Sequence, residues 1–456
     1  MMLIRTTAIA WLTVREAVRS KLLLSLTSLL VAGLVGLPLL ISSDHTLAGK
    51  IQIILTYTTT FATTVLSLTT LWIGCGGVSA EIQDRRFYLV ITKPLHRYEL
   101  WLGKWMGIMV LNVALLALTG LIISTMAHYT IQSAQEPLKE KRHVSEQFLL
   151  AHQILRPLTP DWSKITVEAT QRLVQSGRIP EKMTTEALQK KLIEELKIQR
   201  FTIPPKGGVL FSFQRPAAET LGHDLILNYR FDSTRPERTP VAASWVMGNT
   251  PAHQFHIGVT NYPGVPATLA LGDDVSAATN ILTVAYQRLD DDNQATLMLA
   301  DQTQEPELLV PYGSFEMNLM RGLFVILCRL AFLAALGLTA GCLLSTPVAV
   351  FVAFFIIILM ASSGYVEFVA TSGVFYVPHE GPAPVQTWLD KMILSLFHFF
   401  HGITLPLTRL DPVPLIATGR VVSLEMTLQA LGWLVGLYST IAAVIGITLF
   451  NRRELG

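Results

Sequence analysis

Charged residues are scarce in this chain of 456 residues. Asp, Glu, Lys and Arg together make up 15% of it, well below the roughly 25% typical of soluble domains, while hydrophobic residues make up 51%. This composition excludes an ordinary soluble protein and indicates an integral membrane protein. The formal net charge is only +2, and no basic patch with interleaved aromatic residues occurs, so the sequence predicts no nucleic-acid partner.

Cysteine is also rare, with three residues in total. Cys75, Cys328 and Cys342 all fall in or beside apolar segments, and the long polar region 128–316 contains none. Disulfide bonds are therefore excluded from that region, even if it faces an oxidising compartment. The three thiols are typical of small core residues rather than of a metal or redox centre.

Several catalytic signatures are missing as well. No G-x-x-x-x-G-K-[ST] sequence occurs, so the chain has no phosphate-binding loop with which to hydrolyse ATP. Neither H-E-x-x-H nor G-x-S-x-G is present, which leaves a membrane-bound enzyme without support. We expect no catalytic residue, cofactor or metal ligand in this chain, and any ATP-driven work requires a partner protein.

Six apolar segments are long enough to cross a bilayer, which takes about 20 mainly apolar residues. They are residues 22–42, 52–74, 105–126, 322–341, 347–364 and 427–449. Basic residues, which favour the cytoplasmic side, cluster before the first span (Arg5, Arg15, Arg19, Lys21), in the loop 81–104 and after the last span (Arg452, Arg453). Six spans place all three clusters on one side. This predicts cytosolic N and C termini, a multi-pass protein of the cell inner (cytoplasmic) membrane, and an extracytoplasmic or periplasmic region 128–316.

The predicted fold class is an α-helical polytopic membrane protein with six transmembrane helices and an α+β extracytoplasmic domain. Residues 1–127 hold an amphipathic N-terminal helix and spans one to three, and residues 317–456 hold spans four to six. Between the fifth and sixth spans, segment 365–423 returns along the outer face. Apolar residues from Trp388 to Phe400 recur there at helical spacing, which indicates an interfacial or re-entrant helix.

The extracytoplasmic domain, residues 128–316, has two parts. Residues 137–200 are charged and helix-prone. Residues 201–311 consist of short β-rich runs bounded by turn residues, at 208–213, 224–231, 240–247, 253–260, 279–287, 295–300 and 306–311. Regular short strands of this kind predict a β-sandwich-like part.

The loop 81–104, between spans two and three, is charged and interrupted by proline. Its ionisable residues include Glu81, Asp84, Arg85, Arg86, Lys93, Arg97 and Lys104. Each such charge costs about 2.5 to 3.5 kcal/mol in hydrocarbon, so the loop must lie in water. Glu81 and Arg85 stand four residues apart, on one face of a helix that ends before Pro94.

The N-terminal helix is predicted to be amphipathic. Its polar side comprises Arg5, Thr6, Thr13, Glu16 and Ser20, and its apolar side comprises Ile4, Ala8, Trp11, Val14 and Val18. Such a helix lies on the inner membrane surface and offers its polar face to water or to a protein. The alternative is a simple flank of the first span, with Trp11 at the lipid boundary.

These segments together resemble the membrane subunits, or permeases, of type 2 ABC transporters. The matching residues of the loop are Ser79, Glu81, Ile82, Arg86, Lys93, Pro94, Arg97, Glu99, Gly103, Lys104 and Gly107. TAIAWLTVREAVRSKLL resembles the interface helix of such permeases, LGLTAGCLLSTPVAVF their fourth-to-fifth turn, and FNRREL their cytosolic terminus. The resemblance covers residues 1–127 and 318–456. The large insertion departs from the compact members of the family.

The resemblance implies an assembly of two permeases and two separate ABC ATP-binding subunits. The second permease is another copy of this chain, as a homodimer, or a related permease, as a heterodimer. The implied docking sites are residues 5–20 and the coupling loop 76–104. The residues expected to carry docking and coupling are Arg5, Glu16, Glu81, Asp84, Arg85, Arg86, Phe87, Lys93 and Arg97. The alternative for the loop helix is an ordinary solvated turn held by a local ion pair.

Arg329 is an ionisable residue inside the fourth predicted span. Such residues are functional candidates by default, and Arg329 is a possible part of a pathway that attracts an anionic substrate. The alternatives are snorkelling to the outer interface and a structural ion pair.

The function expected from these features is the membrane-spanning half of an ABC exporter, which couples ATP hydrolysis by its partners to export of an unknown substrate. The alternative is a mechanotransmitter or assembly platform that moves residues 128–316 to regulate an extracytoplasmic partner, without transport. Membrane lipid is a further expected partner. The sequence identifies neither the substrate nor the ATPase.

Overall fold

The computed structural model describes residues 2–41, 46–83, 96–158, 166–167, 202–203, 206–214, 225–233, 240–247, 255–271, 281–289, 296–297, 305–344, 346–373 and 388–452. The chain forms two compact units. A helical unit comprises Met1–Phe148 and Ser314–Gly456, and an inserted unit comprises Leu149–Gly313. Each unit has its own architecture.

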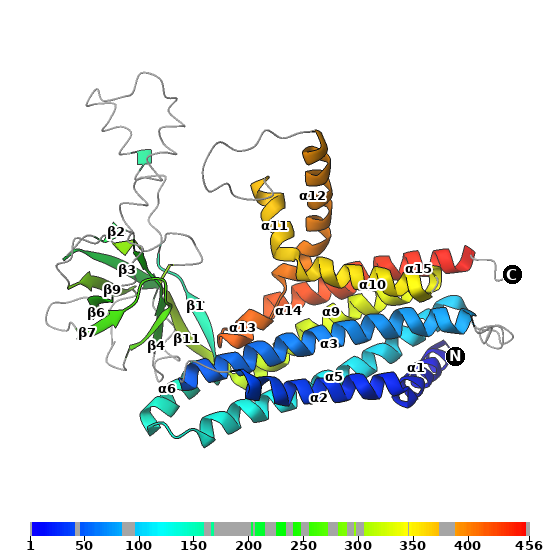
Figure 1. Ribbon diagram of the computed structural model, residues 1–456, viewed down its shortest axis with the longest axis horizontal. Coiled ribbons are helices and arrows are strands. Elements are labelled where there is room, and N and C mark those ends of the chain that lie inside the picture. Colours follow the sequence, from blue (N-terminus) through cyan, green and yellow to red (C-terminus); the bar gives the residue numbers. More distant parts are fainter. Residues whose placement is uncertain are drawn as a thin grey trace. The chain divides into compact units, whose positions relative to one another are not determined.

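Five helical segments of the described residues are long and apolar enough to cross a membrane. They are α2 (Lys21–Leu40), α3 (Leu47–Gln83), α5 (Arg97–Ser133), α9 (Phe315–Leu343) and a final helix made of α14 (Leu424–Ala430), the π-helical η3 (Leu431–Ser439) and α15 (Thr440–Arg452). The chain is therefore a multi-pass membrane protein by helix length and hydropathy. The helices pack side by side in Figure 1.

The span expected at residues 347–364 is not among these five. The helix there, α10 (Thr346–Ala361), has 16 residues, which rise about 24 Å and fall short of the roughly 30 Å hydrocarbon core. It stops because the backbone at Ser362 leaves the helical conformation (φ −90°, ψ 7°), and the chain then turns into α11 (Ser363–Ser372). α11 lies beside α12 (Trp388–Arg409) in Figure 1. The ring centroids of Tyr365 and Phe397 are 6.0 Å apart. The predicted helix that starts at Trp388 is confirmed.

Two of the spanning helices are longer than a membrane is thick. α3 and α5 have 37 residues each, a rise of about 55 Å, so both extend well beyond the hydrocarbon. We call the end where α3 stops and α5 begins the loop end of the helical unit. The opposite end, where α5 stops and α9 begins, is the insertion end.

Close backbone contact holds α3 against α9. Gly337 and Gly341 lie four residues apart on α9, in a small-xxx-small arrangement that lets membrane helices approach closely. A Cβ atom on Gly341 would lie 2.6 Å from the carbonyl oxygen of Cys75, and one on Gly337 would lie 3.2 Å from that of Leu71. Larger side chains would force the two helices apart. Cys75, Cys328 and Cys342 are buried in these helices, as the sequence predicts for small core residues.

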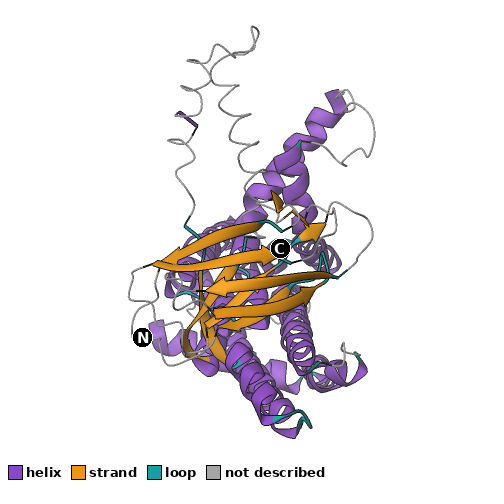
Figure 2. Ribbon diagram, turned by 90° about the vertical axis from the view of Figure 1, so that its left-hand side faces the viewer, coloured by secondary structure: helices purple, strands orange, loops and turns teal. Residues whose placement is uncertain are grey.

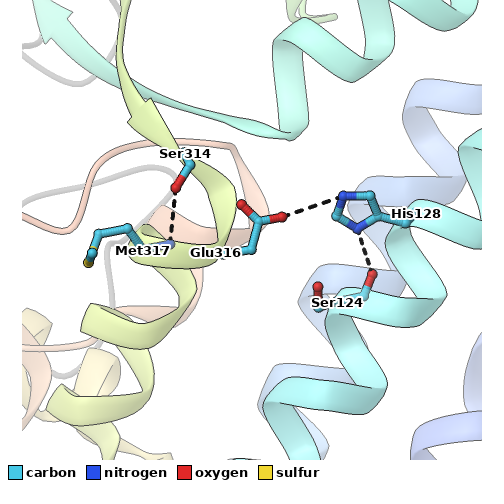
Figure 3. A network of polar contacts seen from close by, with 5 residues as sticks. All are labelled: Ser124, His128, Ser314, Glu316 and Met317. Atoms are coloured by element: carbon cyan, nitrogen blue, oxygen red, sulfur yellow. Dashed lines mark hydrogen bonds and ion pairs between the residues drawn. The ribbon is translucent and has the colours of Figure 1, made fainter.

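A polar contact joins α5 to α9 at the insertion end (Figure 3). His128 Nε2 lies 3.4 Å from Glu316 Oε1, and His128 Nδ1 lies 2.9 Å from the carbonyl oxygen of Ser124. The hydroxyl of Ser314 caps α9 by accepting a hydrogen bond from the backbone N–H of Met317. α5 stops at the insertion end and α9 starts at the same end, so the two helices run antiparallel.

The inserted unit is a β-sandwich-like domain (Figure 2, strands in orange). One four-stranded sheet has the order β1-β11-β4-β8 and the other β3-β9-β6-β7, and a small sheet has the order β2-β10-β5. The strands are β1 (Leu150–Leu155), β2 (Thr202–Ile203), β3 (Gly208–Gln214), β4 (Leu225–Tyr229), β5 (Asp232–Ser233), β6 (Val241–Met247), β7 (Phe255–Asn261), β8 (Ala267–Leu271), β9 (Ile281–Arg288), β10 (Thr296–Leu297) and β11 (Glu307–Ser314).

Both four-stranded sheets contribute to one hydrophobic core, which is what makes the domain sandwich-like. Tyr229 of one sheet packs edge-on against Trp245 of the other, with ring centroids 4.8 Å apart, and Trp245 contacts Tyr286 at 5.0 Å. All three rings are buried, and aromatic side chains of this size dominate the energetics of a core.

Of the expected helical part, 137–200, the structure describes residues 137–158 and 166–167, and the rest lies outside the described residues. α6 (Leu138–Phe148) is a helix, but Leu150–Leu155 forms strand β1, because β11 supplies a partner that the local sequence does not reveal. β2, β5 and β8 are further strands that the predicted β-rich runs did not include. Each of the seven runs predicted in 201–311 contains residues of an observed strand.

Candidate functional site

The N-terminal helix α1 (Met2–Arg19) packs along α5 through a narrow face of small residues. Thr6, Ala10, Thr13 and Ala17 are buried, whereas Trp11 is 69% exposed. This corrects the expected orientation, because Thr6 and Thr13 were assigned to a polar face offered to water or protein. Small side chains at this spacing permit a close helix contact, and that contact determines which face is buried.

Two glycines of α5 make the close contact possible. A Cβ atom on Gly103 would lie 2.7 Å from the Cβ of Ile9, and one on Gly107 would lie 2.7 Å from the Cβ of Thr13. The same atom on Gly107 would lie 2.8 Å from the carbonyl oxygen of Ala10, a backbone atom that cannot rotate away. The α1 helix is therefore seated against the first turns of α5.

A buried carboxylate ties the start of α5 to α1. Glu99 accepts a hydrogen bond from the backbone N–H of His96 (3.1 Å), which satisfies one of the unpaired donors at this helix start. One carboxylate oxygen also lies 4.0 Å from the guanidinium of Arg5, one of the predicted docking residues. The Glu99 side chain is only 3% exposed, whereas that of Arg5 is 38% exposed. The pair thus links a buried helix start to an accessible cation.

Arg97, another predicted docking residue, connects α5 to the last helix. Its guanidinium donates a hydrogen bond to the carbonyl oxygen of Phe450 and lies 5.2 Å from the centre of the Phe450 ring, a cation–π geometry. Phe450 itself is buried in a cluster with Leu100 and Trp101. The start of α5, α1 and the end of α15 therefore meet at the loop end (Figure 1, near the labels N and C).

A cavity of about 290 Å³ opens beside this junction. Its lining comes from four helices: α1 gives Thr13, Glu16, Ala17 and Ser20, α3 gives Trp72, Ile73 and Gly76, α5 gives Lys104 and Ile108, and α9 gives Leu338. Glu16, a predicted docking residue, is exposed, whereas Lys104 is buried. The cavity therefore has ionisable groups among otherwise mainly apolar walls.

The remaining predicted coupling residues lie at or outside the described part of the chain. Glu81 belongs to the last turn of α3, and its side chain is not described. Asp84, Arg85, Arg86, Phe87 and Lys93 lie outside the described residues. The described part of α3 ends before this stretch, and α5 begins after it.

Arg329 lies on α9, away from the loop-end residues in sequence and in helix position. Its Nε atom is buried and donates to no acceptor among the described residues. The role of Arg329 therefore stays a prediction.

Sequence reasoning did not assign a site role to three residues of the junction, namely Glu99, Lys104 and Phe450. The resemblance already included Glu99 and Lys104, and a signal was available: a carboxylate three residues into a helix is typical of a capping box. No local signal marks Phe450, because its contact with Arg97 joins residues that are far apart in the sequence.

No group of His, Cys, Asp and Glu side chains suited to holding a metal ion occurs within the described ranges. Comparison of the chain with protein-family models, with curated proteins and with solved structures found no match. No family is therefore assigned to the chain.

Proposed function

We propose that this protein is the membrane-spanning permease subunit of an ABC exporter. Two copies of the chain, or this chain with a related permease, would surround the pathway, and two separate ATP-binding subunits would dock on the cytosolic side. The loop end is then cytosolic, and the inserted unit lies on the outer, extracytoplasmic or periplasmic, side of the cell inner membrane.

One observation carries the proposal: the charged loop 81–104 emerges from a mechanically connected junction. α1 is seated on Gly103 and Gly107 of α5, and Arg97 links α5 to the end of α15. α3, on the other side of the loop, is packed against α9 by close glycine contacts. A push on this loop therefore reaches five helices, which is what a coupling element requires.

The mechanism follows from this connection. ATP-driven closure of the two docked subunits moves the coupling loop, which begins at the last turn of α3, and Phe87 fills a cleft in the ATPase surface. α3 and α5 transmit the displacement as rigid elements, together with the α1 and α15 segments bound to α5. The chain performs no chemistry on the substrate and supplies no ATPase residue.

The test is charge reversal in the full-length chain, purified with its ATPase after gentle solubilisation. Glu81→Arg and Arg85→Glu should each reduce ATPase retention and lower ATP turnover several-fold, because both residues lie on the proposed docking surface. Arg142→Glu is the matched control: it breaks an i,i+4 ion pair with Glu146 (2.8 Å) on α6, at the insertion end, and should leave both quantities unchanged. Absence of any ATPase, or wild-type turnover in all three variants, contradicts the proposal.

The second candidate is a mechanotransmitter, which the inserted unit favours. Leu149–Gly313 has its own hydrophobic core, large enough to act as a moving part that contacts an extracytoplasmic partner. The two functions differ in whether a lumen opens between the paired spans. Solvent labelling of cysteines introduced along the lumen should depend on nucleotide in an exporter, whereas a lumen sealed in every nucleotide state would eliminate export and favour the mechanotransmitter.

A further inference from the structure

The inserted unit contains a long stretch without formal charge. Residues 240–272 include no Asp, Glu, Lys or Arg. Strands β7 and β8 both lie in this stretch, joined by a turn in which Gly264 adopts a left-handed conformation (φ 79°). Uncharged strands are common inside a hydrophobic core. Whether β7 and β8 can bind another strand therefore depends on their positions in the sheets.

Both strands lie at the edges of their sheets. β7 is the last strand of the order β3-β9-β6-β7, and β8 is the last of β1-β11-β4-β8. Among the described strands, none pairs with the outer edge of β7. The opposite edge of the same sheet differs, because the carbonyl oxygen of Ser212 on β3 accepts a hydrogen bond from the backbone N–H of Leu158 (2.7 Å).

β7 has none of the features that normally prevent an edge strand from pairing with another chain. Proteins protect such edges with Lys, with Pro, with bulges or by keeping the strand short. β7 has seven residues, FHIGVTN, and all of them pair with β6 in an uninterrupted register from Val241↔Asn261 to Met247↔Phe255. Phe255, His256, Gly258 and Thr260 are exposed. An edge of this kind favours strand addition.

We propose that β7 pairs antiparallel with β7 of a second copy of this chain, about a two-fold axis through Gly258. The two four-stranded sheets then join into one continuous sheet. The inference uses one part of the proposed function, the assembly of two copies, and gives that assembly a contact in the inserted unit.

The residue pairs that β7 makes with its own copy favour a second copy of this chain as the occupant. In a seven-residue strand, an axis at the central residue places Ile257 of one copy opposite Val259 of the other, on the side that packs against the core. It also places His256 opposite Thr260 on the outer face. Cross-strand pairs of β-branched residues are favourable, and no like charges meet. The contact closes at two copies, because each copy uses its β7 edge once.

Gly258 provides the probe. A Cβ atom there meets no heavy atom within 4 Å in a single copy, so a side chain at this position leaves the protomer fold intact. At the proposed axis, however, the residue faces its own counterpart. Directly opposed residues of antiparallel strands have Cα atoms about 4.5 to 5.5 Å apart, which lies within the range that a disulfide bond spans.

The experiment is oxidative cross-linking of the full-length chain in its native membrane. Gly258→Cys should form a disulfide-linked dimer, whereas Leu210→Cys should not, although Leu210 is 55% exposed on the opposite edge of the same sheet. The inserted unit has no cysteine of its own. No dimer from Gly258→Cys, or equal dimer from both variants, would overturn the pairing; a partner strand from a different protein would give the first of these results.

The register has its own test. Co-expressed His256→Cys and Thr260→Cys chains should cross-link with each other several-fold more than either chain cross-links with itself, and the reverse ratio would overturn the proposed register. Co-purification of two differently tagged wild-type copies separates this inference from the proposed function. Co-purification without a disulfide in the Gly258→Cys variant rejects the β7 contact alone, whereas no co-purification rejects the two-copy assembly itself.

Discussion

Glu99 and Glu316 have similar local positions but different surroundings. Each lies in the first turn of a spanning helix near a basic side chain, Arg5 at 4.0 Å in one case and His128 at 3.4 Å in the other. The Glu99 side chain is 3% exposed and that of Glu316 is 55% exposed (Figure 3 shows the latter). Ion pairs in water contribute little, whereas a buried charge depends on its partners.

Substitution of these two residues should therefore have different effects. Glu99→Gln keeps an acceptor for the His96 N–H but removes the charge that faces Arg5, and Glu99→Ala also removes that acceptor, for a further loss of about 0.5 to 1.5 kcal/mol. The melting temperature in lipid should fall in the order wild type, Gln, Ala. Glu316→Gln, as the control, should change stability by less than about 1 kcal/mol. Equal melting temperatures for all variants would contradict this account of Glu99.

Gly107 should tolerate no added methyl group. Gly107→Ala places a Cβ atom against the backbone of Ala10, so α1 has to move, and overpacking of this kind typically costs about 1 to 3 kcal/mol. Gly36→Ala on α2 is the control, because a Cβ there meets nothing within 4 Å. Denaturation by SDS titration measures both. A Gly107→Ala variant as stable as Gly36→Ala would show that α1 is not seated on α5.

At the scale of elements, apolar runs predict where helices cross but not where they end. The run 52–74 predicts the middle of α3, yet the helix continues to Gln83, because a helix gains backbone hydrogen bonds in water as well as in lipid. α10 is the opposite case, an apolar run whose helix stops at Ser362. β1 lacked a local signal altogether, since its formation depends on β11, which lies far away in the sequence.

The α3–α9 contact gives a prediction at this scale. Gly341→Ala brings a Cβ atom to about the position 2.6 Å from the Cys75 carbonyl oxygen, so the two helices must separate, and the variant should unfold at clearly lower SDS fraction than wild type. Gly432→Ala, in η3, is the matched control, because a Cβ atom there meets nothing within 4 Å. Indistinguishable unfolding of the two variants would argue against a glycine-dependent contact.

At the scale of the whole molecule, some features can be predicted from the sequence and others cannot. The order of spans, the charged loop and the β-rich insertion can be predicted from hydropathy and periodicity. The junction at the loop end cannot, because it joins Arg5 to Glu99 and Arg97 to Phe450 across long sequence separations. The charged residues of the loop were predicted as a docking surface, and their role stays a prediction.

Site-specific photo-cross-linking from position 87 tests the central claim, docking of an ATPase on the loop. A photoreactive phenylalanine analogue replaces Phe87 in the full-length chain, and the control replaces Tyr129, which is 72% exposed near the insertion end of α5. Illumination of intact membranes should link position 87, but not position 129, to a subunit that binds ATP. No ATP-binding product at position 87, or the same product at both positions, would contradict the account.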